Sequence, residues 1–353
     1  MSSSLPSLAS RIGRAGWTRG RSRLLSAVGL PIARLLVRVA RSSGGGVAVA
    51  LVYHRVGDPA GDPRRELVPA LGTKLFAAQV RHLASGYRLV VASELLAAAR
   101  ERRRGEPFPV AITFDDDLSS HADAAAPILS SAGATATFFV SGASLDGPHR
   151  FWWERLQAAL DDDLDLSALD LEPAPSKARI HQVGLRIQSL PPRARDELDA
   201  SLGELVGPDP QESGLRAEAL RRLVASGLEI GFHTRRHDVL PALGDAELAE
   251  AMRVGRSELE DVVGPLRTIS YPHGLADARV AAAARAAGFE AGFTGEPAAV
   301  ASGSDPLLLG RVSPSYASVG ELAFDVAWTL CRAAFSGRGP ASPARRARRA
   351  MPA

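Results

Sequence analysis

Two short segments carry side chains that together suit a metal site. An acidic run at residues 115–117 follows the apolar run 110–114, and much later His233 and His237 follow the apolar run 228–232. Carboxylates and imidazoles are ligands that Zn²⁺ and similar divalent metals take in proteins. One carboxylate left over beside such a metal is able to act as a general base on water. The two segments therefore predict a metal-dependent hydrolytic site.

Each segment alone has a simpler explanation. An acidic run after a strand often forms only a turn or a helix N-cap, and two histidines four residues apart are often only surface residues. Both segments, however, directly follow predicted strands, and functional groups gather at the carboxyl ends of parallel strands. His233 and His237 are also spaced to share one face of a helical turn, so that they converge on one ion. We therefore expect three metal ligands with an open coordination position.

The elements that must position these residues alternate between strands and helices. Short apolar runs predict strands at 47–53, 88–91, 110–114, 135–140, 228–232, 268–271 and 290–294. Helical spacing predicts helices at 75–83, at 92–103 with Ser93 as its N-cap, and at 122–132, 245–263 and 276–287. Residues 150–222 break this rhythm and predict a helical insertion. The repeated strand–helix units indicate an α/β fold with a parallel sheet or barrel.

The residues of both segments resemble those of a known family. Thr113-Phe114-Asp115-Asp116-Asp117 resembles the T-F-D-D-G motif of the polysaccharide deacetylases, the carbohydrate esterases with a NodB-like homology domain. His233-Thr234-Arg235-Arg236-His237 resembles their H-[ST]-x-x-H motif, and Ser270-Tyr271-Pro272-His273-Gly274 resembles their third motif. The resemblance covers about residues 47–315.

This resemblance implies a distorted (β/α) barrel of the polysaccharide deacetylase type, with a helical insertion. It also implies a metal-dependent hydrolase that removes acetyl groups, first of all N-acetyl groups, from a polysaccharide or glycan precursor. Asp116, His233 and His237 would hold a divalent metal, with Zn²⁺ expected, and Asp115 would be the general base. The backbone N–H of His273 would help to hold the oxyanion.

Three positions depart from the family's pattern. Asp117 replaces a glycine and adds a carboxylate that is a further candidate for the site. Ser270 stands where many members have an arginine that orients the base. No L-x-H motif is found near the last strand, so that the usual histidine acid is missing. Arg311 lies in this region, and we expect it to orient Asp115.

Other residues are candidates with two explanations each. His54 and His121 lie near predicted strand ends, where each is able to serve as the acid or as a structural hydrogen-bonding group. Tyr271 of the third motif is a further candidate for the site. Trp152 and Trp153 are able to stack on sugar rings or to form the core of the helical insertion.

The two ends of the chain are basic. Residues 1–44 contain eight arginines and no acidic residue, and their apolar residues recur at helical spacing. They predict a basic amphipathic leader, and a helix of this kind is able to lie on an anionic membrane surface. The alternatives are a poorly ordered basic arm and a helix packed on the core. Residues 45–334 form the predicted catalytic domain, and residues 335–353 a disordered basic tail.

The sequence also bears on compartment and partners. No clean signal peptide and no run long enough to cross a membrane is found. Cys331 is the only cysteine, which excludes a disulfide within the chain. We expect a cytoplasmic protein, or one peripheral on the cytoplasmic membrane face, with an acetylated glycan as its substrate. Nucleic acid is not expected as a partner, since the arginine-rich ends lack interleaved aromatic residues.

Two alternatives to this function remain. A catalytically degenerate family member would bind glycan without turnover, which the missing acid histidine favours. A metal-dependent amidohydrolase would act on a non-sugar substrate, since one fold hosts different chemistries. The intact set of Asp115, Asp116, His233 and His237 favours an enzyme, because a pure binder needs no base.

Overall fold

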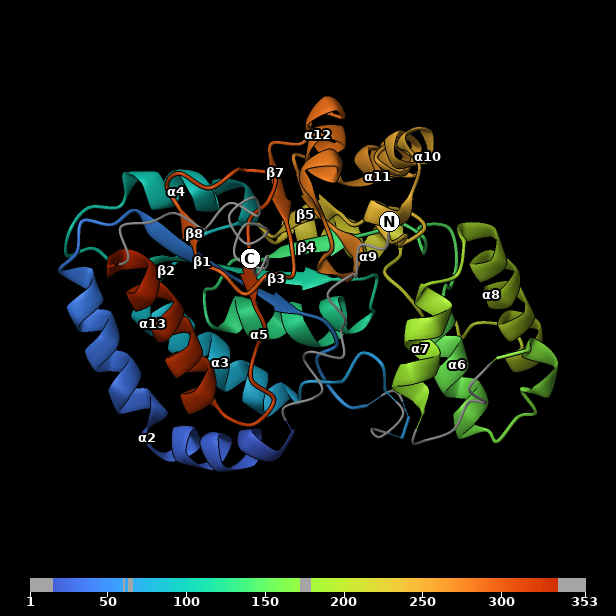
Figure 1. The fold of residues 1–353 in the computed structure, drawn as a ribbon, viewed down its shortest axis with the longest axis horizontal. Helices are drawn as coiled ribbons and strands as arrows, with labels where there is room; N and C mark the ends of the chain where they lie inside the picture. Colours follow the sequence, from blue (N-terminus) through green and yellow to red (C-terminus); the bar gives the residue numbers. More distant parts are fainter. Residues whose placement is uncertain (1–14, 60, 63–65, 172–178, 336–353) are drawn as a thin grey trace, which may run out of the picture.

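A mostly parallel β-sheet forms the centre of the molecule in the computed structural model, which describes residues 15–59, 61–62, 66–171 and 179–335 (Figure 1). The main path of the sheet runs in the order β7-β6-β5-β4-β3-β1-β8. Its parallel strands are β1 (Val47–Tyr53), β3 (Pro109–Asp115), β4 (Thr137–Val140), β5 (Glu229–Phe232), β6 (Thr268–Ser270) and β7 (Ala291–Phe293). The short β2 (Arg88–Leu89) pairs with the start of β3, and β8 (Val300–Ala301) is antiparallel to β1.

The sheet curves until its two ends almost meet. β9 (Arg311–Val312) lies parallel to β1, and just before it Leu309 forms a parallel bridge to Phe293 at the end of β7. β7 and β1, which are the two ends of the parallel sheet, are thus linked through the segment that leads into β9. The result is the nearly closed barrel that the strand–helix repeats predict.

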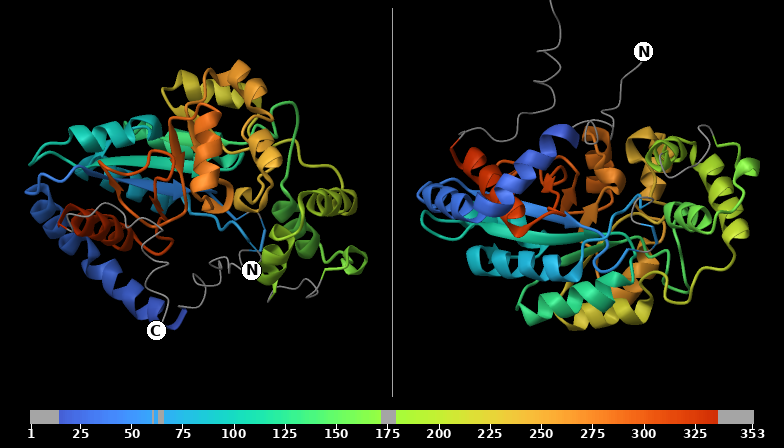
Figure 2. Two further views of the ribbon diagram at one scale, coloured as in Figure 1. Left: turned by 45° about the horizontal axis from the view of Figure 1, so that its top comes forward. Right: turned by 90° about the horizontal axis from the view of Figure 1, so that it is seen from below.

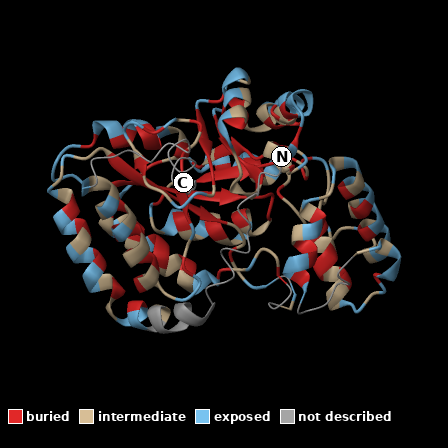
Figure 3. Cartoon of the chain, in the orientation of Figure 1, coloured by how far each residue is buried: buried red, intermediate tan, exposed pale blue. Residues whose placement is uncertain are grey.

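The central strands are buried along their whole length. All seven residues of β1 and all seven of β3 are buried. Strands that are covered on both faces show such continuous burial, because helices lie outside the sheet while side chains fill the barrel within. Figure 3 shows this buried centre, with most of the exposed residues on the surrounding helices and loops.

Helices surround the strands. They are α3 (Thr73–Gly86), α4 (Leu95–Glu101), α5 (Ala126–Ser131), α9 (Ala217–Ala225), α10 (Asp245–Ala251), α11 (Arg256–Val263) and α12 (Ala278–Ala286). A further pair consists of α2 (Ala15–Arg41) and α13 (Val319–Phe335). These first and last helices of the described chain lie side by side (Figures 1 and 2).

The helical insertion is present and has a core of its own. α6 (Trp152–Asp161), α7 (Ile180–Gln188) and α8 (Pro192–Val206) gather at one end of the molecule, away from α2 and α13 (Figure 1). Trp152 and Trp153 are buried in this core, so the insertion-core explanation describes their packing. The predicted range 150–222 is slightly too long, since α9 contacts β5 and belongs to the barrel.

Two expectations about helices are wrong. Residues 245–263 form α10 and α11 instead of one long helix, because Gly255 between them has a left-handed φ of 77° that ends helical geometry. Ser93 is not the N-cap of the next helix. It lies inside a short 3₁₀ turn, and Glu94 precedes α4 without a capping side-chain hydrogen bond.

Helix α2 is packed on the core, which is one of the alternatives for the predicted leader. Leu25, Ala33 and Ala40 are buried on its inner face. Its contact with α13 is very close, since a Cβ on Gly29 would lie only 2.2 Å from the carbonyl oxygen of Gly320. Residues 1–14 of the predicted leader and residues 336–353 of the predicted tail lie outside the described residues. No helix of the described ranges is long and apolar enough to cross a membrane.

Candidate active site

The candidate site lies where β3, β5 and β6 end. Asp115 is the last residue of β3, His233 directly follows β5, and Ser270 is the last residue of β6. These strands belong to one parallel set, so their carboxyl ends open on the same side of the barrel. Asp116 follows with a φ of 75°, a left-handed conformation that aspartate tolerates better than most residues. This turn sends Asp115 and Asp116 to different partners.

Asp116, His233 and His237 form one compact cluster. The Oδ1 atom of Asp116 lies 3.6 Å from Nε2 of His233 and 3.4 Å from Nε2 of His237. One potential ligand atom from each residue lies within 4.8 Å of the other two. Asp116 and His233 are only 2% and 1% exposed. The three residues predicted as metal ligands are therefore brought together.

The cluster fits a divalent metal. Oδ1 of Asp116 is buried and has no hydrogen-bond donor among the described residues. A buried carboxylate oxygen without a donor is costly unless a cation compensates it. Burial raises the pKa of Asp116, but the two histidines lower it more, so the carboxyl stays ionised. One carboxylate and two imidazoles that leave positions open are a donor set of the kind that catalytic Zn²⁺ takes.

A tight turn, not a helix, brings His233 and His237 together. Thr234 and His237 have left-handed φ values of 54° and 50°, and the two imidazole rings lie 4.9 Å apart. The expectation that the histidines share a helical turn is therefore wrong, although the residues themselves converge. Two left-handed residues in four fold the backbone back more sharply than a helix does.

The orientation of His233 is fixed by a backbone carbonyl. Its Nδ1 lies 2.8 Å from the carbonyl oxygen of Ser270. Because a carbonyl only accepts, Nδ1 carries a proton, and Nε2 is the nitrogen left to bind a metal beside Asp116. This is the arrangement that a metal-ligating histidine requires. Burial lowers the pKa of His233, but Asp115 and Asp116 raise it more, so a metal would have to displace a proton from Nε2.

Asp115 is held by Arg311 through two parallel hydrogen bonds. Both guanidinium–carboxylate distances are 2.7 Å, and Oγ of Ser270 donates a third hydrogen bond at 3.1 Å. Burial raises the pKa of Asp115, but Arg311 and His233 lower it more, to about 2. Asp115 is therefore a carboxylate at neutral pH, ready to accept a proton. The contact expected between Arg311 and Asp115 is present.

His273 and His54 lie beside the cluster. His273 has a φ of 59°, its ring lies 4.5 Å from that of His237, and its Nε2 has no hydrogen-bond partner within the described chain. Burial and the neighbouring His237 lower the pKa of His273 well below the usual value, so its ring is neutral. His54 is close enough to lower the pKa of Asp115 and Asp116.

Two other candidates, Asp117 and Tyr271, have partners outside the site. Asp117 accepts hydrogen bonds from the backbone N–H and the hydroxyl of Ser141 at 2.5 and 3.0 Å, so it anchors the loop after β4 and is not among the grouped ligand atoms. Tyr271 is buried in the core and donates to the carbonyl of Leu307 at 2.8 Å. The structure therefore brings neither side chain into the site, contrary to expectation.

His121 is a core residue. Its ring packs between Phe114 and Phe138, and its Nε2 lies 3.3 Å from the carbonyl oxygen of His54. Burial lowers its pKa to about 3, which keeps the ring neutral. The structural explanation therefore describes this histidine.

The insertion supplies contacts that sequence patterns did not reveal. Arg195 of α8 is buried and forms an ion pair with Asp238, the residue after His237. The ring of Trp153 lies 4.9 Å from that of His237. In the sequence, the only sign that Asp238 lies near the site is its place directly after the histidine motif. Nothing in the pattern of the insertion indicated that Arg195 pairs with it.

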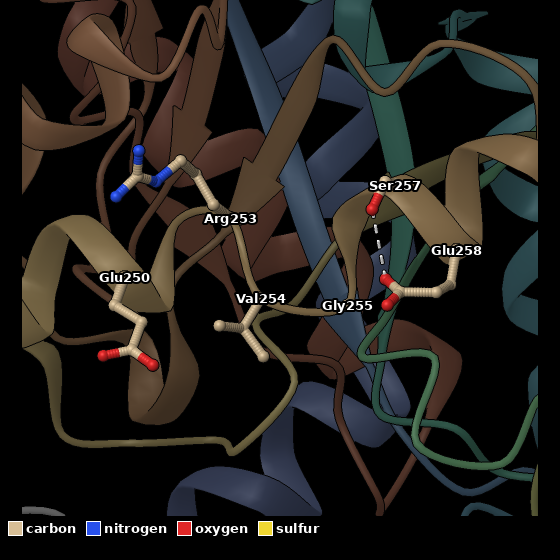
Figure 4. Close-up of a pocket in the computed structure, with 6 residues that line it drawn as sticks. All are labelled: Glu250, Arg253, Val254, Gly255, Ser257 and Glu258. Carbon is tan, nitrogen blue, oxygen red and sulfur yellow. Dashed lines mark hydrogen bonds between the residues drawn. The ribbon is translucent and has the colours of Figure 1, made fainter.

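A separate surface hollow lies between α10 and α11 (Figure 4). Its lining residues are Glu250, Arg253, Val254, Gly255, Ser257 and Glu258. None of these is a candidate site residue. The hydrogen bond drawn between them runs from the hydroxyl of Ser257 to the carboxylate of Glu258. The hollow therefore adds nothing to the cluster around Asp116.

Comparison with known proteins identifies the family of the chain. The family model described as polysaccharide deacetylase matches residues 102–292, just over half of the chain. No curated relative matches the chain.

Several solved structures share the fold. The Streptococcus pyogenes deacetylase PplD, in complex with acetate, is 15% identical with a TM-score of 0.56, over 80% of this chain and 98% of that one. IcaB from Ammonifex degensii is 20% identical with a TM-score of 0.51, over 80% and 98%. The Bacillus cereus polysaccharide deacetylase BC0361 is 18% identical with a TM-score of 0.52, over 79% and 69%. These similarities confirm the predicted fold class.

Proposed function

Because the chain belongs to the polysaccharide deacetylase family, we propose that it hydrolyses the amide bond of N-acetyl groups on a glycan at the cluster of Asp116, His233 and His237. Enzymes of this family are hydrolases that act on carbon–nitrogen bonds. The observation that carries the proposal is the buried, donor-free Oδ1 of Asp116, which faces the Nε2 atoms of two histidines. We propose Zn²⁺ as the first candidate for the metal.

Each residue of the site has a task in this reaction. A divalent metal held by the three ligands would supply positive charge that polarises the acetyl carbonyl and makes water more acidic. Asp115 accepts the proton of the attacking water, and Arg311 holds its carboxylate in place. The backbone N–H of His273 donates to the developing oxyanion. Water adds to the carbonyl carbon, the carbon–nitrogen bond breaks as the nitrogen takes up the proton that Asp115 accepted, and acetate and an amine are released.

A binder without turnover is a weaker proposal. The ion pair between Asp115 and Arg311 is almost completely buried, with side chains 5% and 1% exposed. Burying two charges is expensive, and replacing such a pair by apolar residues is often neutral or stabilising. A protein that only bound glycan would have no use for a carboxylate kept ionised beside the candidate metal ligands.

The test combines metal content with acetate release. Purified wild-type protein should contain close to one divalent ion per chain by plasma mass spectrometry and should release acetate from N-acetylated oligosaccharides. His233→Ala should lose both the metal and the activity. Asp115→Asn should keep the metal and lose turnover, whereas Asp123→Asn, at an exposed position near α5, should behave as wild type. Undiminished hydrolysis by Asp115→Asn would rule out its role as the base.

A further inference from the structure

The outer side of the α2–α13 pair carries a continuous apolar surface. The two helices run in the same direction, since Gly29 lies against Gly320 and a Cβ on Gly45 would lie 3.3 Å from the carbonyl oxygen of Ala334. Their inner sides are buried, through Ala33 on α2 and Val326 on α13 among others. What remains is the side that faces away from the barrel.

Large apolar residues recur along this outer side of α2. Leu24, Ile32, Leu35 and Val39 are exposed, and Leu24 and Leu35 are more than 60% exposed. Their spacing follows the period of a helix, so they form one stripe instead of isolated residues. Most exposed apolar residues on a soluble surface are scattered singly, and a continuous stripe indicates a binding surface.

Helix α13 continues the apolar surface with aromatic residues. Trp328 is 50% and Phe335 is 56% exposed, and the ring of Phe324 stacks on Trp328 at 6.1 Å. Given the parallel contact of the two helices, helical spacing places these rings next to the α2 stripe on the outer side. A half-exposed tryptophan suits a membrane interface, where its apolar ring and its N–H meet lipid and water together.

The charge beside the stripe is positive. Helix α2 contains six arginines and no acidic residue. Arg38 is exposed beside the apolar stripe, and Arg34 is exposed on the side of the helix near His82 of α3. Arg332 is exposed on α13. Helix α13 has two acidic residues. Glu321 accepts hydrogen bonds from the hydroxyls of Ser22 and Ser315 at 3.2 and 2.8 Å, and Asp325 is half-buried.

We propose that this outer face of α2 and α13 binds the surface of an anionic phospholipid bilayer. Apolar side chains would enter the boundary between headgroups and acyl chains, while the arginines pair with lipid phosphates. A second copy of the same face would instead bring arginines of α2 against one another. The buried inner face of α2 stays on α13, so the helix binds lipid as part of the folded domain. The proposal concerns a different face from the catalytic site and does not depend on the reaction.

Vesicle co-sedimentation of the full chain tests the proposal. Wild-type protein should sediment with vesicles of phosphatidylcholine and phosphatidylglycerol, far less with phosphatidylcholine alone, and less as salt rises. The double variant Leu35→Ser/Trp328→Ser should weaken partitioning about tenfold or more. Arg38→Gln should weaken it about fivefold.

Matched controls lie on other faces of the molecule. Leu205→Ser/Val224→Ser removes two exposed apolar residues, and Arg193→Gln/Arg221→Gln removes two exposed arginines. These variants should partition as wild type, with all thermal midpoints compared to exclude unfolding. Wild-type protein that stays in the supernatant with both vesicle types would overturn the proposal. So would equal loss in the controls, or a dimer that Leu35→Ser/Trp328→Ser converts to monomer in sedimentation velocity.

Discussion

Arg195, on a helix of the insertion, forms an ion pair with Asp238, the residue that follows His237 in the candidate metal site. Both side chains are only 6% exposed. A second ion pair joins the same turn to α8, because Arg236 donates to the carboxylate of Asp196 at 2.5 Å. The insertion therefore braces the loop that carries one metal ligand, although it lies outside the barrel.

Loss of this brace should weaken metal binding. Arg195→Met should lower the affinity for Zn²⁺ about tenfold, because a loosened turn no longer holds His237 toward Asp116. Competition with a metal chelator measures the affinity, and the visible spectrum of the Co²⁺-loaded protein reports the ligand geometry. Arg195→Lys should recover part of the loss.

A control separates bracing from general stability of the insertion. Arg155 pairs with Asp199 and Asp209 inside the insertion and does not contact the histidine turn. Arg155→Met should lower the thermal midpoint while leaving the Zn²⁺ affinity near that of wild type. Equal losses of affinity in the Arg155 and Arg195 variants would contradict a specific brace.

Arg311→Lys should separate turnover from metal binding. Lysine keeps the charge but not the two parallel hydrogen bonds to Asp115, so the carboxylate is less well oriented. We expect kcat to fall about tenfold to a hundredfold with metal content unchanged. Arg102→Lys is the matched control, since Arg102 is also buried but binds backbone carbonyls such as that of Gly45 at 2.9 Å. It should lose stability and keep kcat.

The close approach of α2 and α13 predicts a strong effect at one glycine. Gly29→Ala should destabilise the protein by about 1–3 kcal/mol, because the new methyl group overlaps the backbone of Gly320. Denaturant unfolding measures the change. Gly86→Ala, at the end of α3, meets nothing within 4 Å and should be neutral or slightly stabilising. Similar behaviour of the two variants would show that the helices do not pack so tightly in solution.

The insertion should lose stability in acid through Asp209. Burial raises its pKa, but hydrogen bonds from the side chain of Arg155 and the backbone N–H of Arg150 lower it more. The depressed pKa means that Asp209 stabilises the fold above its ordinary value of 3.8 and that this contribution is lost as pH falls through the folded value. The pKa of Asp199 shifts in the opposite direction, since burial raises it. Its contribution to the pH dependence of stability therefore has the opposite sign.

The measurement compares wild type with Asp209→Asn across this range. At neutral pH the variant should be less stable by about 1 kcal/mol after allowance for solvent screening. The difference should shrink as pH drops below 3.8, the ordinary pKa of the group. A difference that stays constant with pH would mean that the charge of Asp209 does not contribute.

The sequence predicted the strand positions and the metal-ligand set, but not how the ligands converge. Apolar runs located β3 and β5 to within a few residues, because buried parallel strands leave a continuous pattern. The spacing of His233 and His237 suggested a helix, whereas the backbone uses left-handed residues that spacing does not encode. Periodicity reports which face is buried and says little about single φ angles.

Contacts between distant segments were mostly beyond sequence reasoning. Arg311 was connected to Asp115 only through its place after the predicted last strand. Nothing in the sequence connected Arg195 with Asp238, since their ion pair depends on how the insertion docks on the barrel. Asp117 was expected in the site because of its neighbours, but Ser141 engages its carboxylate.

The barrel closes with a strand that comes late in the chain. Ala50 of β1 pairs with Arg311 of β9, so every residue between these two strands must be synthesised before this contact forms. Pairing between segments so far apart in the chain slows folding, because the conformational entropy of the long loop is lost before the favourable contact has formed. The same residue is the partner of Asp115. A chain in which β9 has not yet paired with β1 therefore lacks the arginine that orients Asp115.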